Sequence, residues 1–234
     1  MTRSASRERL LLTALVALVY SLYLPVGLWS ATLTPHPVEV ALDGATPFLP
    51  GWAFVYLLLY TMAALPLVVP FERLAFRRVV AAYLTIDLLS LLVFVLFPVH
   101  MTLRPDLAAE GSFAEWMMAQ LYEVDRPSNC FPSLHVSTTI LAALCVLKVD
   151  RVLGWGGLVV ATAISASTML VKQHYLADVL SGAALALAAW WLLVRPVPME
   201  RVPFSWRRVA PLALAQLGLF ALLWALYLLG VDLR

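Results

Sequence analysis

The sequence predicts an all-α protein, a polytopic bundle of helices that cross a membrane. Hydrophobic residues make up 62% of the 234 residues and charged residues only 13%, and the mean hydropathy is +0.88. Apolar stretches long enough to cross a bilayer also recur along the chain. This composition lies far outside the range of soluble globular domains. We expect seven spans, at residues 10–29, 52–70, 80–98, 133–149, 153–171, 175–194 and 210–230.

The first span is expected to be a retained helix. Arg3, Arg7 and Arg9 precede an apolar run of about twenty residues, which is long for a signal peptide, and no convincing small-x-small cleavage site follows. A basic segment separates the second and third spans, and a long polar segment, 99–132, separates the third and fourth. We therefore predict a six-span domain over residues 1–198, followed by a cytoplasmic linker and an extra span in 199–234.

Charge orients the predicted bundle. If the N-terminus is cytoplasmic and the spans alternate, 12 of the 16 Lys and Arg residues lie inside, as the positive-inside rule requires. These are Arg3, Arg7, Arg9, Arg73, Arg77, Arg78, Lys148, Arg151, Arg195, Arg201, Arg207 and Arg208. The other 16 − 12 = 4 are Arg104, Arg126, Lys172 and Arg234. We expect the plasma membrane of a bacterium, with segment 99–132 on the periplasmic side.

Composition also excludes other partners and frameworks. A formal net charge of +2, without a long basic run, argues against nucleic acid. Two cysteines, Cys130 and Cys145, are too few for a disulfide framework.

Three polar stretches meet the outer membrane surface in this topology. They are "FPVHMTLRP" at 97–105, "DRPSNCFPSLHVS" at 125–137 and "STMLVKQHYLADVLSG" at 167–182. A bundle can bring their ends together, although they lie far apart in the sequence.

The third stretch contains a histidine and a carboxylate at helical spacing. His174 and Asp178 are four residues apart, so they share one face of a helix. The carboxylate can fix the imidazole tautomer and leave the other ring nitrogen free to attack. An unpaired carboxylate at the start of a span would be costly, so Asp178 requires such a partner.

The other stretches supply groups for an anion. Arg104 and Lys172 carry positive charge, and Arg can grip a phosphate through two parallel hydrogen bonds. Pro132 suits a first helical turn, so the backbone N–H groups around Ser133 and Leu134 can bind an anion. His135 then lies beside that phosphate and can exchange a proton with a leaving group. Two further candidates have alternative roles: Arg126 is a rim contact or a solvated loop charge, and Asn129 is a contact or a helix cap.

The motif "FPSLH", followed by "HYLAD" with a Ser seven residues before its His, resembles the type-2 phosphatidic acid phosphatase superfamily. The sequences "NCFPSLH" and "STMLVKQHYLAD" together are closer to the inositol phosphorylceramide synthase-like, inositolphosphotransferase branch of that superfamily. The resemblance covers residues 10–194. It implies a six-helix core and catalysis through phosphohistidine without a metal or another cofactor. His174 would be the nucleophile, Asp178 its orienting partner and His135 the general acid and then base.

The same resemblance implies that Arg104, Ser133 and Lys172 hold the phosphate, and three positions depart from it. Phe97 stands where the pattern has Lys, Leu134 where it has Gly, and Thr168 where it has Arg. We expect Lys172 to replace the charge missing at Thr168.

The predicted function is that of a lipid phosphate phosphatase or phosphotransferase, with a membrane lipid phosphate as substrate. One alternative is a transferase that moves a phospho-headgroup to a lipid or polyol hydroxyl. An alternative from another class is a membrane protein in which His135 and His174 bind haem or a metal ion. Asp87, inside the third span, is either functional or an interhelical hydrogen-bond partner.

Overall fold

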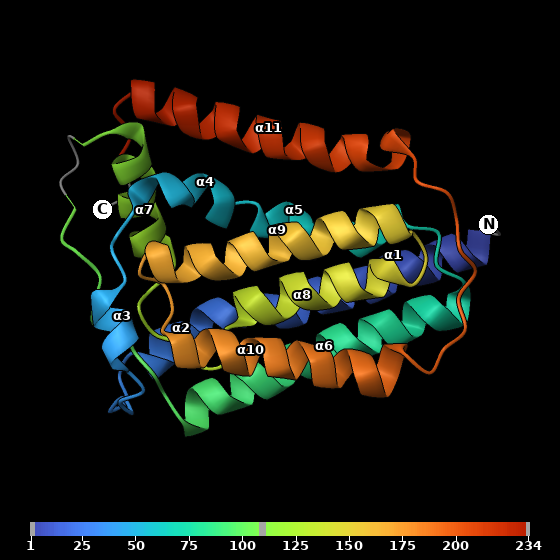
Figure 1. Ribbon diagram of the computed structural model, residues 1–234, viewed down its shortest axis with the longest axis horizontal. Helices are drawn as coiled ribbons and strands as arrows, with labels where there is room; N and C mark the ends of the chain where they lie inside the picture. Colours follow the sequence, from blue (N-terminus) through green and yellow to red (C-terminus); the bar gives the residue numbers. More distant parts are fainter. Residues whose placement is uncertain (1–2, 108–110, 233–234) are drawn as a thin grey trace.

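The computed structural model describes residues 3–107 and 111–232, and throughout these ranges every regular element is a helix. Figure 1 shows the long helices lying side by side along one axis of the molecule. The side chain of Arg3 and all of Arg234, two residues that entered the predicted charge distribution, lie outside the described part.

Five helices of the described chain are long and apolar enough to cross a membrane. They are Ser6–Ser30, formed by α1 (Arg3–Ser21) and α2 (Tyr23–Ser30); α6 (Arg73–Leu96); α9 (Arg151–Leu170); Leu176–Val194, formed by α10 (Leu176–Ala189) and η3 (Trp190–Val194); and α11 (Trp206–Leu228). They coincide with the first, third, fifth, sixth and seventh predicted spans. The predicted fold class, a polytopic helical bundle, is confirmed.

The other two predicted spans are shorter or irregular. The fourth is α8 (Leu134–Leu147), a helix of 14 residues. The second predicted span, 52–70, is not one continuous helix, because the chain there forms four short pieces. These are η1 (Pro50–Trp52), α4 (Ala53–Tyr56), α5 (Leu59–Ala63) and η2 (Leu65–Val68). Pro66 has no N–H for an α-helical bond, and the chain tightens into 3-10 turns around it.

The polar segment 99–132 contains a helix that the sequence reading did not predict. In α7 (Phe113–Val124) the Glu115 amide donates to Ser112 Oγ at 3.4 Å, and the Ser112 amide donates to Glu115 Oε2 at 2.7 Å. This capping box starts the helix, and the bonds from the Ser112 hydroxyl and amide lower the pKa of Glu115. The helix buries Trp116 and Met118 against the bundle. Another short helix, α3 (Ala41–Ala45), lies in the loop between the first and second predicted spans, at the same end of the bundle as α7 (Figure 1).

Helix α8 forms the centre of the bundle, with α6, α9 and α10 packed around it. Leu141, Ala142 and Ala143 are fully buried. Glycines on the neighbouring helices permit very short approaches. A Cβ atom at Gly182 of α10 would lie 2.4 Å from the Ser133 carbonyl oxygen, so α10 can touch the start of α8 only with glycine there.

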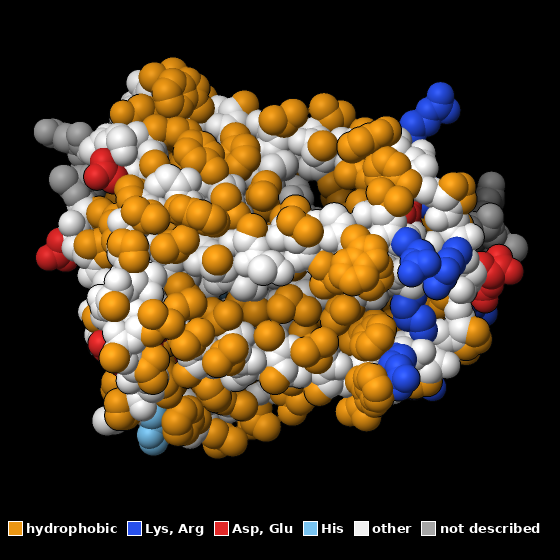
Figure 2. Space-filling model, in the orientation of Figure 1, with side chains coloured by type: hydrophobic (Ala, Val, Ile, Leu, Met, Phe, Trp, Pro, Cys, Tyr) orange, Lys and Arg blue, Asp and Glu red, His pale blue; other side chains and the backbone are white. Residues whose placement is uncertain are grey.

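The surface has an apolar flank and two different ends. Figure 2 shows hydrophobic side chains along the length of the helices and Lys and Arg gathered at one end. We call this the basic end; Arg73, Arg77, Lys148 and Arg151 lie where α6, α8 and α9 begin or end. The opposite end, with α3, α7 and the first turns of α8 and α10, is called the site end (Figure 1). An apolar flank of this kind is what an integral membrane protein presents to lipid.

Replacing Gly182 with Ala is expected to destabilise the protein, because the added methyl group collides with the Ser133 carbonyl and forces α8 and α10 apart. Overpacking of this kind costs about 1–3 kcal/mol. Thermal unfolding in detergent should show a lower Tm for Gly182→Ala. Gly218→Ala is the matched control, because a Cβ there meets nothing within 4 Å; an equal Tm for the two variants would contradict the packing argument.

Candidate active site

Two backbone junctions position the candidate catalytic groups at the site end. The Ser133 amide donates to the Asp178 carbonyl at 3.0 Å, which joins the first turn of α10 to the start of α8. Ser133 also caps α8, because its hydroxyl accepts from the Val136 amide at 3.3 Å. His135 therefore lies in the first turn of α8, beside the chain that enters α10.

The two histidines are in direct contact. His135 Nδ1 and His174 Nε2 are 2.9 Å apart. His174 Nδ1 lies 3.3 Å from Asp178 Oδ2. The exposed fraction is 6% for His135 and 4% for His174, so the pair lies in a largely water-excluded site. The structure thus brings together the three residues that the sequence predicted as catalytic.

The prediction that His174 and Asp178 share a helix face was wrong in its geometry. His174 lies in the turn before α10, and Asp178 is in the first turn of that helix. The contact forms because the carboxylate folds back as a cap and accepts from the Tyr175 amide at 2.9 Å. The same oxygen then reaches the His174 ring.

A second carboxylate lies on the far side of His135. Asp125 Oδ2 is 3.6 Å from His135 Nε2. Tyr56 lies between them, with its hydroxyl 3.1 Å from His135 Nε2 and 3.2 Å from Asp125 Oδ2. The Tyr23 hydroxyl donates to Asp125 Oδ1 at 2.7 Å. Sequence reasoning did not identify Asp125, Tyr23 or Tyr56 as site residues. Asp125 could have been found, because it is the first residue of the polar stretch 125–137 that contains His135.

Arg104 reaches the site from the segment that follows α6. Its Nη1 donates to the Asp125 carbonyl at 2.8 Å, its Nη2 donates to Gln173 Oε1, and its guanidinium lies 4.4 Å from the centre of the Tyr122 ring. Within the described residues, Arg104 Nε and Gln173 Nε2 are buried donors without a hydrogen-bond partner. Gln173 is a further residue that the sequence reading missed.

Lys172 directs its side chain into a structural contact. Its Nζ donates to the carbonyls of Asp43 at 2.8 Å and Thr46 at 2.6 Å, and the residue is buried. With φ of 51°, Lys172 adopts the left-handed conformation that ends α9. Asp43 extends the contact, because its Oδ1 accepts from the Leu176 amide at 2.8 Å. Lys172 thereby fastens the loop around α3 to the chain that carries His174.

The remaining predicted site residues lie around this centre. The Ser133 amide, expected to face an anion, is engaged by Asp178, and Leu134 is buried at the start of α8. Asn129 and Arg126 line a pocket of about 240 Å³ beside Asp125. Arg126 is exposed, whereas Asn129 is buried and its Nδ2 donates to the Tyr23 carbonyl at 2.8 Å.

One set of side chains has the donor types of a metal site. The ligand atoms of Cys130, His174 and Asp178 lie within 4.8 Å of one another. Burial raises the pKa of the Cys130 thiol well above its usual value, followed by the effect of the nearby Asp178 carboxylate. A metal ion bound there would have to displace the thiol proton, because the thiolate is the form that binds metals.

Replacing Lys172 with Met is expected to loosen the loop around α3, because two backbone carbonyls lose their buried donor. Hydrogen–deuterium exchange should become faster in residues 41–46. Lys148→Met is a matched control, since Lys148 Nζ bonds the Val194, Arg195 and Val197 carbonyls at the basic end. That variant should affect 194–197 instead; unchanged exchange at 41–46 in Lys172→Met would rule out the fastening role.

The geometry agrees with comparisons to known proteins. Residues 13–192 match the family model described as PAP2 superfamily. Neither the curated proteins nor the solved structures contain a significant match. The matched region covers α2 to α10, and with them the His–His–Asp centre. This chain, an integral membrane protein with a phosphatase- or phosphotransferase-type site, belongs to the PAP2 superfamily.

Proposed function

We propose that the protein is a metal-independent lipid phosphate phosphatase or phosphotransferase that works through a phosphohistidine on His174. The observation that carries this proposal is the 2.9 Å contact between His135 Nδ1 and His174 Nε2. The two ring nitrogens proposed to react, His135 Nδ1 and His174 Nε2, point toward each other. The other ring nitrogen of each histidine lies near a carboxylate, Asp125 for His135 and Asp178 for His174. By the charge distribution, the site end faces the periplasm.

In the first step His174 Nε2 attacks the phosphorus atom. Asp178 accepts the Nδ1 proton of His174 in a hydrogen bond, so the lone pair is on Nε2. The phosphate enters between the two rings and replaces the contact between His135 Nδ1 and His174 Nε2. The phosphorus–nitrogen bond forms as the bond to the lipid oxygen breaks. His135 Nδ1 gives its proton to that oxygen, and the lipid alcohol departs.

In the second step His135 is the base. Its Nδ1 takes a proton from the acceptor, either water or an alcohol, whose oxygen attacks the phosphorus. The phosphorus–nitrogen bond breaks, and its electron pair returns to His174 Nε2. Both histidines then have their initial protonation states, and the product is inorganic phosphate or a phosphate ester.

Arg104 and Gln173 are proposed to hold the phosphoryl oxygens. Both belong to one hydrogen-bonded pair beside the histidines, and each has a buried donor without a partner in the described part of the chain. A buried N–H without a partner is costly, and phosphoryl oxygens would satisfy these two. Arg104 also neutralises charge that develops on those oxygens.

Asp125 is proposed to support His135 in its cationic form. Neutral His135 can accept the Tyr56 hydroxyl proton at Nε2, whereas cationic His135 carries a proton there. The Tyr56 hydroxyl can then accept from His135 and donate to Asp125. The carboxylate at 3.6 Å stabilises the charge that His135 carries as a general acid.

A lipid substrate follows from the location of the site. The histidines lie at the start of α8, inside a bundle with an apolar flank. The pocket beside Asp125 is bordered by Leu24 and Leu28, which are exposed on α2. A substrate with hydrocarbon chains can reach this pocket from the membrane.

The polar lining of the pocket beside Asp125 is compatible with transfer as well as with hydrolysis. The pocket beside Asp125 also presents Glu123, Arg126, Ser128 and Asn129, and carboxylate and amide groups hydrogen-bond hydroxyls. An acceptor alcohol in this pocket, on a lipid or a polyol, would make the protein a transferase of the inositol phosphorylceramide synthase-like kind. A panel of lipid phosphates and acceptor alcohols, with released phosphate and transferred phosphoryl group measured separately, distinguishes these functions and tests the proposal.

The haem alternative requires an iron ion between two histidines. Haem-ligating histidine pairs usually face each other within the spans, whereas His135 lies in the first turn of α8 and His174 lies just before α10. A visible absorption spectrum of the purified protein tests it.

Replacing either histidine should separate their roles. His174→Ala removes the atom that carries the phosphoryl group, so every substrate should fail. His135→Ala removes general acid help, which is worth about 10²–10⁴-fold for an aliphatic alcohol and far less for an acidic phenol. With an aryl phosphate, His135→Ala should release at most one phenol per active site and then stall. Rapid-quench kinetics measures this burst.

The stalled His135→Ala protein should contain an acid-labile phosphoenzyme, because a phosphorus–nitrogen bond hydrolyses in acid. Peptide mapping should locate it on His174. A burst from His174→Ala, or phosphate on another residue, would overturn the assignment.

Asp125→Asn should impair the acid step selectively. The amide preserves the size of the side chain but not the charge that faces His135, so kcat/KM should fall on the order of tenfold for a lipid phosphate. An aryl phosphate, which needs little acid help, should be much less affected. Asp43→Asn is the control for loss of a buried carboxylate near the site. Equal losses for both substrates in Asp125→Asn would indicate a merely structural role.

Excess EDTA should leave the activity unchanged, because the positive charge at the site comes from Arg104. The measurement is phosphate release before and after dialysis against chelator. Loss of activity with recovery on adding magnesium would require a metal mechanism.

A further inference from the structure

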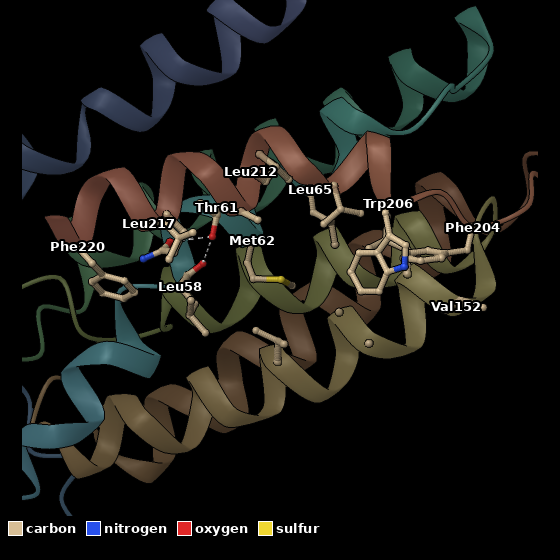
Figure 3. A pocket seen from close by; sticks show the side chains of 17 residues that line it. Leu58, Thr61, Met62, Leu65, Val152, Phe204, Trp206, Leu212, Leu217 and Phe220 are labelled. Carbon is tan, nitrogen blue, oxygen red and sulfur yellow. Dashed lines mark hydrogen bonds between the residues drawn. The ribbon is translucent and has the colours of Figure 1, made fainter. Parts of the chain in front are cut away.

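The donors for a metal ion are not in the long groove beside α11. That groove has a volume of about 760 Å³, and residues of α5, α9 and α11 line it (Figure 3). None of these lining residues has a carboxylate, an imidazole or a thiol. The three donor types come together at the site end instead, in Cys130, His174 and Asp178, whose ligand atoms lie within 4.8 Å of one another.

Cys130 is held between the two chain segments that form the site. Its Sγ is 3.4 Å from the Pro127 carbonyl oxygen, in the segment before α8. The same sulfur is 3.9 Å from the carbonyl oxygen of Gln173, the residue next to His174. With an exposed fraction of 2%, the thiol is enclosed beside the turn that carries His174.

Asp178 has one carboxylate oxygen without a hydrogen-bond donor. Its Oδ2 accepts from the Tyr175 amide at 2.9 Å and lies 3.3 Å from His174 Nδ1. Its Oδ1 is buried and has no hydrogen-bond partner in the described part of the chain. Turning the carboxylate over only exchanges its two oxygens, so one of them always lacks a donor. A buried acceptor of this kind is costly when it is left empty, and a cation would satisfy it.

The three donor types together favour zinc. Zinc binds thiolate sulfur, imidazole nitrogen and carboxylate oxygen tetrahedrally, with bonds of about 2.0–2.3 Å. Ligand atoms around such an ion are about 3.3–3.8 Å apart, and His174 Nδ1 and Asp178 Oδ2 are already 3.3 Å apart. Magnesium is a poor occupant, because it requires an octahedron of oxygen ligands.

The charges of this set balance those of a divalent ion. A thiolate and a carboxylate each carry one negative charge, and a ligating imidazole is neutral, so the complex with Zn²⁺ has no net charge. The exposed fractions are 2% for Cys130, 4% for His174 and 0% for Asp178. An unbalanced charge would be costly at such burial, whereas a neutral complex avoids that cost.

We propose that Cys130, His174 and Asp178 form an inhibitory zinc site. The ion binds the thiolate, His174 Nδ1 and the carboxylate, and a water molecule completes the tetrahedron. The thiol proton leaves to water, and the proton on His174 Nδ1 is exchanged through water for one on Nε2. Nε2 then has no lone pair with which to attack phosphorus. The binding rests on the geometry alone, and the inhibition rests on the proposed function.

Binding is measured on the full-length protein in detergent after chelator has removed bound metals. Cobalt is the probe, because a cobalt–thiolate bond gives a charge-transfer absorption band, and displacement by zinc gives the Kd. One equivalent should bind. Cys130→Ala should lose the band and bind zinc at least tenfold more weakly, since loss of even an outer partner of a ligand costs that much. Cys145→Ala is the matched control, because Cys145 is the other buried free cysteine and is not part of the set.

Inhibition is measured separately, with an aryl phosphate as substrate. One equivalent of zinc should inhibit the wild type and Cys145→Ala, EDTA should restore their activity, and magnesium should have no effect. Half-inhibition of Cys130→Ala should require at least tenfold more zinc.

The two measurements separate the possible failures. A cobalt–thiolate band that persists in Cys130→Ala, or that is lost equally in Cys145→Ala, would overturn the zinc site. Zinc that binds at Cys130 without slowing turnover would overturn the inhibitory role. A protein that shows no phosphatase or transferase activity with any substrate contradicts the proposed function instead, and the cobalt and zinc titrations still decide whether the site exists.

Discussion

The hydrogen bond from the Ser133 amide to the Asp178 carbonyl, at 3.0 Å, is the contact on which the site depends. It joins the first turns of α8 and α10, and it exists because Gly182 has no side chain to hold the helices apart. His135 lies in the first turn of α8 and His174 lies in the turn that leads into α10, so the spacing of the two rings follows from how the two backbones meet at this junction. Asp178 makes two of these contacts: its carbonyl accepts from the Ser133 amide of α8, and its carboxylate lies beside the His174 ring. A small change in the crossing of α8 and α10 would therefore alter the positions of both His174, the proposed nucleophile, and His135.

The parts of the site that could be predicted are those with local patterns. His174 and Asp178 are four residues apart, and His135 follows a proline that suits a first helical turn, so short stretches contained the information. Asp125 shows why the rest could not be predicted. Its hydroxyl partners are Tyr23 and Tyr56, which lie 102 and 69 residues away in the sequence. No spacing rule connects such residues, and only the packing of α2, α4 and α7 brings them together.

Residue type predicted where the charged groups lie in the sequence better than it predicted where their side chains point. Lys172 was expected to face a phosphate, yet its ammonium bonds two carbonyls of the loop around α3. Hydropathy similarly predicted which segments are apolar but not how they are coiled, because Pro66 and its neighbours suit both a span and a series of tight turns. Helix α7 was missed since the segment between spans is polar overall, although Ser112 and Glu115 have the spacing of a capping box.

The shortness of α8 has a consequence for how the protein meets its bilayer. Its 14 residues extend about 21 Å, whereas a typical hydrocarbon core is about 30 Å thick. The helices around it are long enough to cross, so the first turn of α8 is recessed below the level of the surrounding headgroups. The proposed substrate, a lipid phosphate, would have to move below the headgroup level to reach His135, or the bilayer would have to become thinner around the protein. Hydrophobic mismatch thus links the accessibility of the site to the acyl-chain length of the host membrane.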